Sequence, residues 1–138
     1  MYPDSLTRWS PQALSLLRIV AGLLILQYGT AKIFGFPPVQ MFAGVKIASL
    51  YGVAGLIELI GGFLLLIGLF SRPVAFILSG EMAAAYFIGH FPKGFIPLLN
   101  GGNEAVIYCF VFFYLIFAGP GPWSIDAVRQ SALTKELT

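Results

Sequence analysis

Three ionisable side chains lie inside long apolar stretches of the sequence, where a charge is expensive. Arg18 is followed by an apolar run, Glu58 interrupts a run of Leu, Ile, Val, Ala, Gly and Phe, and Glu81 lies among small residues. An ionisable group at the centre of a bilayer costs about 2.5–3.5 kcal/mol on insertion scales, so it needs a partner or a role. We therefore take Arg18, Glu58 and Glu81 as a candidate intramembrane polar cluster.

Arg18 is the expected partner of these acids. On antiparallel helices, Arg18 falls about four residues and Glu81 about eight residues from the same membrane surface, within reach of a long Arg side chain. The spacing predicts an Arg18–Glu81 pair, with Glu58 as a third member.

Two interpretations of the cluster remain open. It is an internal clamp that fixes helix packing, or it lines a cavity for a small molecule or a proton. A Glu without enough positive charge nearby stays protonated, which suits proton exchange or a hydrogen bond to a quinone carbonyl.

Small residues accompany the charged ones at helical spacing, so that helices can approach closely there. The first set is Arg18, Gly22, Ile25, Gly29 and Lys32, the second is Gly52, Gly55, Glu58 and Gly62, and Glu81 has Ala84 and Ala85 beside it.

Secondary polar candidates gather at helix ends: Lys32, His90, Asn100 and Glu104. Asn100 or Asn103 can cap exposed amides, and His90 is interpreted as an interfacial histidine. With one histidine and one cysteine, Cys109, the sequence has no set of metal ligands or redox thiols, so we expect no metal site and no catalytic residue.

The composition of the chain indicates whether water or lipid surrounds the folded protein. Of its 138 residues, 58% are hydrophobic and 10% charged, against about 45–50% and about 25% in soluble domains. The net charge of +2 comes from scattered residues with no basic run, which argues against a nucleic-acid partner. The expected surroundings are a lipid bilayer and other proteins.

Four apolar segments approach the roughly 20 residues that cross a bilayer. They cover about 13–34, 49–70, 73–91 and 104–118, the last being short for a full crossing. The sequence predicts an all-α integral membrane four-helix bundle with short connections, in a single domain of residues 1–138. The segment after residue 34 is expected to be interfacial or re-entrant, and Pro-Gly residues after 118 end the last span.

The Lys and Arg bias favours termini in the cytoplasm. One side carries Arg8, Arg18, Arg72, Arg129 and Lys135, and the other Lys32, Lys46 and Lys93. A cleaved leader at the start is the weaker alternative, because the first segment stays apolar to Phe34 and carries a polar stripe.

Together, several motifs resemble the DoxX family along nearly the whole chain. They are Leu17-Arg18 with Gly22, Lys32-Ile33-Phe34-Gly35, Gly55-Leu56-Ile57-Glu58-Leu59, Gly68 to Pro73, Gly80-Glu81-Met82-Ala83, Pro97 to Gly102, and Gly119-Pro120-Gly121-Pro122-Trp123. One departure is Asn103, which separates Gly102 from Glu104 where relatives often place the acid directly after the glycines.

The resemblance implies a compact four-helix protein of the bacterial inner membrane that works with membrane oxidoreductases, quinone-linked or related to thiol and oxidative stress. The leading hypothesis is an accessory subunit whose polar cluster offers a niche to a quinone or a lipid headgroup. A small-molecule or proton carrier and a structural or assembly module are the alternatives. No motif binds a cofactor, and homo-oligomerisation is left open.

Overall fold

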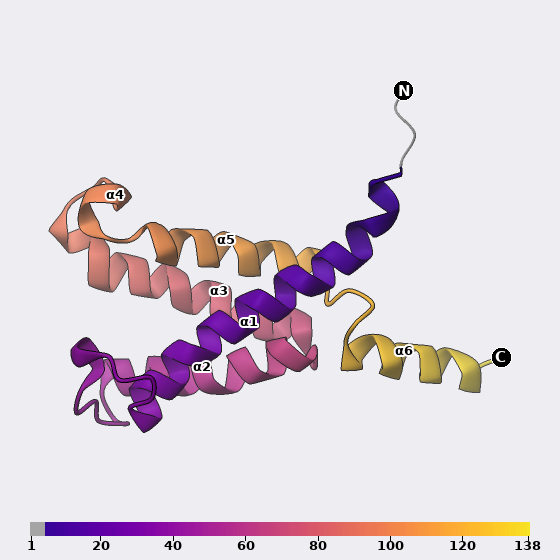
Figure 1. Ribbon diagram of the computed structural model, residues 1–138, viewed down its shortest axis with the longest axis horizontal. Helices are drawn as coiled ribbons and strands as arrows, with labels where there is room; N and C mark the ends of the chain where they lie inside the picture. Colours follow the sequence, from indigo (N-terminus) through magenta and orange to yellow (C-terminus); the bar gives the residue numbers. More distant parts are fainter. Residues whose placement is uncertain (1–4) are drawn as a thin grey trace.

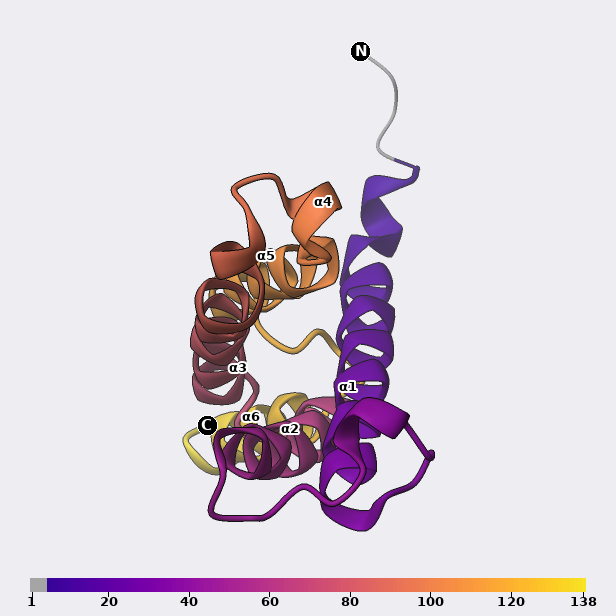
Figure 2. The same ribbon diagram turned by 90° about the vertical axis from the view of Figure 1, so that its left-hand side faces the viewer.

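The computed structural model describes residues 5–138, and every regular element in that range is a helix. Four helices lie side by side (Figures 1 and 2): α1 (Ser10–Phe34), α2 (Leu50–Ile67), α3 (Ser71–Ala85) and α5 (Asn103–Ala118). The expected all-α class is therefore confirmed.

Shorter elements connect these helices and follow them. They are the 3₁₀ turns η1 (Thr7–Trp9), η2 (Gln40–Phe42) and η4 (Phe91–Lys93), the π turn η3 (Tyr86–His90), the single turn α4 (Pro97–Asn100) and the terminal helix α6 (Ile125–Glu136).

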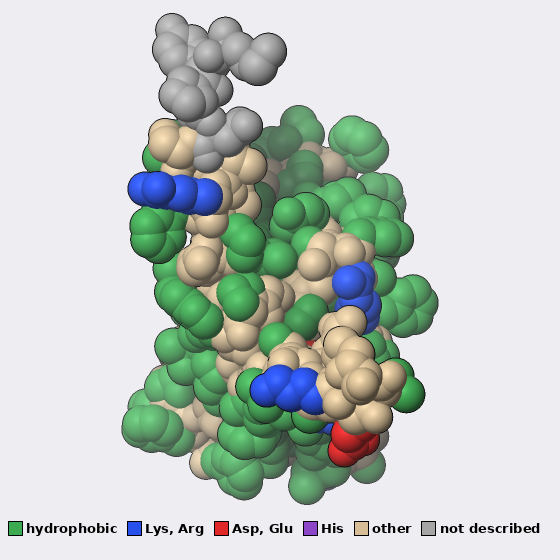
Figure 3. Space-filling model, turned by 90° about the vertical axis from the view of Figure 1, so that its right-hand side faces the viewer, with side chains coloured by type: hydrophobic (Ala, Val, Ile, Leu, Met, Phe, Trp, Pro, Cys, Tyr) green, Lys and Arg blue, Asp and Glu red, His purple; other side chains and the backbone are tan. Residues whose placement is uncertain are grey.

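Three continuous helical segments are long and apolar enough to cross a membrane: Thr7–Phe34, Leu50–Ile67 and Ser71–Lys93. Large hydrophobic side chains such as Phe76, Phe110 and Phe117 are more than 60% exposed on the flanks of the bundle. Seen from the end that carries both termini, hydrophobic atoms cover most of the sides, and the cations form separate patches (Figure 3). Such a surface is stable only in lipid, so this is a membrane protein.

The helix boundaries follow from local backbone chemistry. Ser49 caps α2 by accepting the Gly52 N–H at 3.1 Å, and α2 ends where Gly68 takes a left-handed conformation, φ 72°. The second helix thus stops at Ile67, earlier than the expected residue 70.

The helices associate as two close pairs, α1 with α2 and α3 with α5. At the α1–α2 contact a Cβ added to Gly62 would lie 2.7 Å from the Leu26 backbone nitrogen, and one added to Gly29 would collide with the Leu59 backbone. The glycines predicted to permit close approach do so here. Buried side chains, including Ile25, Leu65, Leu78, Phe112 and Leu115, fill the centre of the bundle.

Two features of the chain differ from the expectation or extend it. Residues 35–49 form a loop that contains η2 and turns Phe42 back into the protein, where it is 9% exposed. After residue 118 the chain forms the largely polar helix α6, which the sequence did not predict and which points away from the bundle (Figure 1).

Candidate functional site

A buried ion pair joins α1 to α2. The Nζ atom of Lys32 lies 2.9 Å from Oε1 and 2.8 Å from Oε2 of Glu58, and both side chains are less than 10% exposed. Two charge-assisted hydrogen bonds from one ammonium are a strong arrangement in a medium without water. Lys32, expected as a secondary residue at a helix end, is therefore the cation of the site.

The glycine pattern of α2 places this pair. A Cβ on Gly55 would lie 2.7 Å from the Cβ of Lys32, so only glycine leaves room for the Lys32 stem to run along α2 toward Glu58. Gly55 is three residues before Glu58 and hence on the same helix face. Gly55 gives the Lys32 side chain room along α2, and Glu58 binds its ammonium group.

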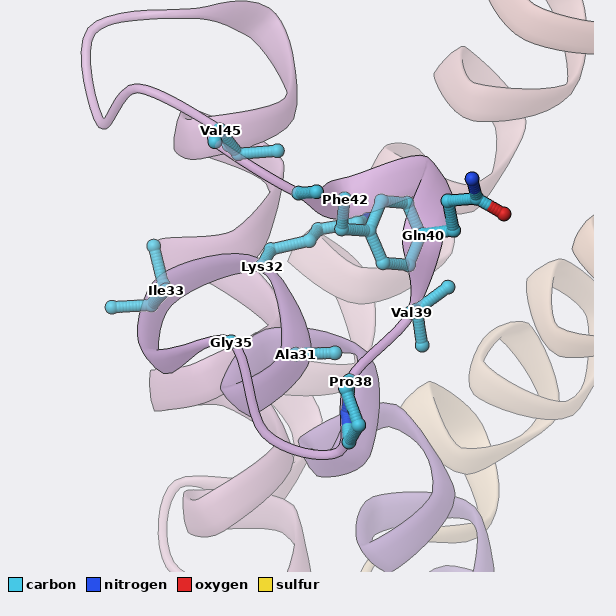
Figure 4. A pocket seen from close by; sticks show the side chains of 11 residues that line it. Ala31, Lys32, Ile33, Gly35, Pro38, Val39, Gln40, Phe42 and Val45 are labelled. Atoms are coloured by element: carbon cyan, nitrogen blue, oxygen red, sulfur yellow. The ribbon is translucent and has the colours of Figure 1, made fainter.

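Three aromatic rings surround the ammonium group of Lys32. Its Nζ lies 5.1 Å from the ring centroid of Phe42, 5.8 Å from that of Tyr28 and 6.0 Å from that of Tyr51. Figure 4 shows the lysine side chain extending toward the Phe42 ring. Each ring face stabilises a cation by about 0.5–2 kcal/mol. The three rings, which form an aromatic cage, therefore favour an ammonium group at this position.

Glu81 approaches the pair from α3. The Glu81 carboxyl group lies near enough to Glu58 for the two to affect one another, and Oε2 of Glu81 is buried without a donor among the described residues. Two carboxylates are both acceptors, so a hydrogen bond between them needs a proton. A single proton between the two carboxyl groups would give the unpaired Glu81 oxygen a donor.

The expected pair of Arg18 and Glu81 is wrong. Arg18 is fully buried, but within the described part of the chain its guanidinium donates only to backbone carbonyls: Nε to Pro120 at 2.7 Å, Nη1 to Leu65 at 2.7 Å and Leu66 at 2.9 Å, and Nη2 to Trp123. Carbonyls in the last turn of α2 and after α5 lack the ordinary intrahelical donor four residues on, so they can accept from a planar donor. Arg18 fastens the C-terminal segment to the bundle and is not a member of the acid cluster.

Two other secondary candidates organise the connection between α3 and α5. Asn100 is 4% exposed, donates to the Gly94 carbonyl at 2.9 Å and accepts the Gly102 N–H at 2.8 Å. His90 Nδ1 lies 3.1 Å from the carbonyl oxygen of Asn100. These contacts fix a loop, and they do not bring His90 or Asn100 to the Lys32 pair.

Glu104 connects the start of α5 to α1. Its Oε1 accepts the Tyr28 hydroxyl at 2.7 Å. Tyr28 also flanks the Lys32 ammonium, so one side chain contacts both the exposed Glu104 and the buried cluster. Neither Tyr28 nor Phe42 stood out in the sequence, because aromatic residues are ordinary components of apolar segments.

Asp126 of α6 caps the N-terminus of α3 from a distance. Its carboxylate accepts the Phe70 N–H at 2.9 Å and the Ser71 N–H at 2.8 Å, while its own N–H donates to the Gly68 carbonyl at 2.9 Å. Burial opposes ionisation of this carboxyl, but the hydrogen bonds from Ser71 and Phe70 and the nearby Arg129 outweigh it and hold the Asp126 pKa below its ordinary value. Asp126 therefore docks α6 to the bundle as a carboxylate.

A cavity of about 430 Å³ lies outside the aromatic cage. It is lined by the last turn of α1 and by residues 38–45, including Phe42 and the stem of Lys32 (Figure 4). Phe42 lies against the lysine on one side and lines the cavity on the other.

The arrangement can bind and release a proton, and it offers no ligand set for a metal. No group of three His, Cys, Asp or Glu side chains among residues 5–138 is suitably placed for a metal ion. The chemistry of the site lies in the carboxyl oxygens of Glu58 and Glu81 beside a fixed ammonium.

Comparison with known proteins gives the family. A protein of Haemophilus influenzae, itself uncharacterized, is 42% identical over 128 residues, covering 89% of this chain and 95% of its own length. No solved structure matches the chain. The DoxX family model matches residues 13–91, which include Lys32, Glu58 and Glu81. The expected resemblance is thereby confirmed, and the chain belongs to the DoxX family.

Proposed function

We propose that this protein is a small accessory subunit of a membrane oxidoreductase system, and that the Lys32–Glu58–Glu81 cluster takes up and releases one proton for a lipid-soluble redox carrier of the quinone class. The protein resides in the bacterial inner membrane with both termini in the cytoplasm. Its redox partners carry the electron-transferring groups.

The single observation that carries this proposal is the second carboxyl group beside an ion pair that is already complete. Lys32 and Glu58 satisfy one another through two short hydrogen bonds. A purely structural clamp needs no further acid, yet Glu81 brings a buried oxygen without a donor to the same place. Burying a carboxyl oxygen without a hydrogen-bond donor is costly, so the presence of Glu81 at this position supports a functional role for its proton.

The composition of the chain supports a role beside other redox proteins. The sequence has one cysteine and one histidine, too few for iron–sulfur or paired haem ligation. Members of the DoxX family are associated with quinone-linked and thiol-related oxidoreductase systems, as the resemblance of the motifs implies.

The charge distribution supports the orientation. Arg18 and Lys32 are buried and bonded internally, so neither acts as a surface charge. The exposed cations are then Arg8, Arg72, Arg129 and Lys135 at the end with the termini, against Lys46 and Lys93 at the other. This bias is the one that cytoplasmic termini carry.

The test compares Glu81→Gln and Glu58→Gln with the control Glu136→Gln, an exposed acid on α6. Infrared spectra of the purified protein in lipid bilayers detect the carbonyl stretch of a protonated buried carboxyl group. We expect that band in the wild type and in Glu136→Gln, and we expect it to be lost in the two cluster variants. In native membranes the same two variants should lose quinone-linked activity while partner proteins still co-purify.

Each alternative gives a different result. A proton carrier changes proton flux into vesicles of the purified protein without partners. A structural clamp shows only lower yield or melting temperature in the cluster variants. Absence of the carboxyl band in the wild type refutes the proposed proton site.

A further inference from the structure

Among the described residues, a tyrosine beside the buried cluster is hydrogen-bonded to an exposed acid. Tyr28 lies on α1 one turn before Lys32, and its hydroxyl donates to Glu104 Oε1 at 2.7 Å. Its ring lies 5.8 Å from the Lys32 ammonium. Glu104 itself is exposed, in the first turn of α5.

The groups of the cage differ in their ability to transfer a proton. Phe42 has no exchangeable hydrogen and closes the cage toward the loop of residues 35–49. Tyr51 has a hydroxyl, and its ring is 6.0 Å from Lys32, but no described carboxylate is bonded to it. Tyr28 alone of the three rings links a surface acid to the cluster.

We propose that Glu104 and Tyr28 form the route by which protons reach the Lys32–Glu58–Glu81 cluster, from the membrane surface opposite the termini. This inference depends on the proposed proton site and adds its side of access. Glu104 collects the proton from water, and Tyr28 relays it.

The transfer balances as a sequence of O–H exchanges. Water protonates the Glu104 carboxylate, which then donates its hydrogen to the Tyr28 oxygen. The hydrogen that Tyr28 carried turns inward to a carboxylate of the cluster, and rotation of the hydroxyl restores its bond to Glu104. The net change is one proton moved from water to the cluster, with no other bond broken.

Within residues 5–138, the titratable or charged groups around Tyr28 come from α1, α2, α3 and α5. Those of the packed helices are Tyr28 and Lys32 on α1, Tyr51 and Glu58 on α2, Glu81 on α3, and Glu104 and Tyr108 on α5. Tyr108 is 9% exposed and stacks on Phe112, so it lies inside the bundle and opens no second path to water. The phenol of Tyr28 thus binds the surface acid Glu104 directly, and its ring lies beside the cation of the buried cluster.

The experiment measures the rate at which the cluster gains a proton. Purified protein in lipid nanodiscs starts at an alkaline pH at which the carboxyl band is absent, receives a light-triggered pH drop from a caged proton, and is followed by time-resolved infrared spectroscopy of the buried carboxyl band. Tyr28→Phe and Glu104→Gln should each slow the appearance of the band by about tenfold or more, because each removes one acid–base link. The final amplitude should match that of the wild type, since the cluster itself is intact.

Tyr51→Phe is the matched control, because it removes a hydroxyl from the same cage at nearly the same distance from Lys32. It should keep the wild-type rate. Glu104 is exposed, so Glu104→Gln tests the route even if Tyr28→Phe folds poorly. A wild-type rate in Glu104→Gln, or slowing by Tyr51→Phe instead, overturns the route. Loss of the band itself, expected for Glu81→Gln, concerns the proton site and not its access.

Discussion

Removal of Lys32 tests the energetics of the buried cluster directly. In Lys32→Met the cage is filled by a flexible apolar side chain of similar length, and Glu58 loses both of its short hydrogen bonds to Nζ. Breaking a buried ion pair by deleting one partner costs about 3–5 kcal/mol. We expect about 3 kcal/mol, because Glu58 recovers part of the cost by taking a proton beside Glu81.

The double variant Lys32→Met/Glu58→Met gives the sharper result. Replacing both members of a buried pair by apolar residues is often neutral or stabilising, because no charge remains to be desolvated. The double variant should therefore be more stable than either single variant. Their coupling free energy should be about 3 kcal/mol or more, well above that of an exposed pair.

The assay is reversible unfolding in mixed micelles, titrated with a denaturing detergent and followed by circular dichroism. Lys93→Met, which removes an exposed lysine at the same end of the bundle, is the control and should change stability by less than about 0.5 kcal/mol. Additive costs of Lys32→Met and Glu58→Met would refute the reasoning, because independent side chains do not form the pair that the site requires.

Three further predictions concern packing and the terminal segment. Gly62→Ala should cost about 1–3 kcal/mol in the same unfolding assay, since its Cβ would lie 2.7 Å from a backbone atom, whereas Gly80→Ala meets open space and should be neutral. Asp126→Asn should cost about 1 kcal/mol near neutral pH. Because the folded-state pKa of Asp126 is lowered, wild-type stability should fall between about pH 5 and about pH 2, and this fall should be smaller in the variant. Arg18→Met should expose the chain after Gly119 to limited proteolysis, since the carbonyls that held the guanidinium lose their donor.

The sequence predicted the helices well because hydropathy and helix breakers act locally. The apolar segments and the expected stop after residue 118 correspond to α1, α2, α3 and α5 within a few residues, although α2 ends at Ile67 and not at residue 70. Helix α6 was not predicted, because its stability in place comes from Asp126, whose acceptor role depends on backbone amides of Phe70 and Ser71 far away in the chain. Almost any residue type can supply a backbone amide, so the sequence at Phe70 and Ser71 does not reveal these contacts.

The candidate site was predicted in part. Glu58 and Glu81 lie together, but their cation is Lys32 rather than Arg18. Depth along a helix places Lys32 near the surface, and only Gly55 on the opposing helix lets its side chain run inward. Arg18 has the depth expected of a partner, yet free carbonyls at helix ends satisfy it first. Arg18 is held by backbone carbonyls, and Lys32 passes α2 at a position where Gly55 has no side chain. Composition and spacing reveal neither arrangement.

The carbonyl acceptors of Arg18 are synthesised at different times, some of them long after Arg18 itself. Arg18 leaves the ribosome early, but Pro120 and Trp123 are made 102 and 105 residues later, roughly 5–20 s at ordinary rates of synthesis. During that interval the guanidinium has only part of its final set of acceptors, and its long side chain can reach the headgroup region. The full set of Arg18 acceptors can therefore form only after residues 120 and 123 have been synthesised.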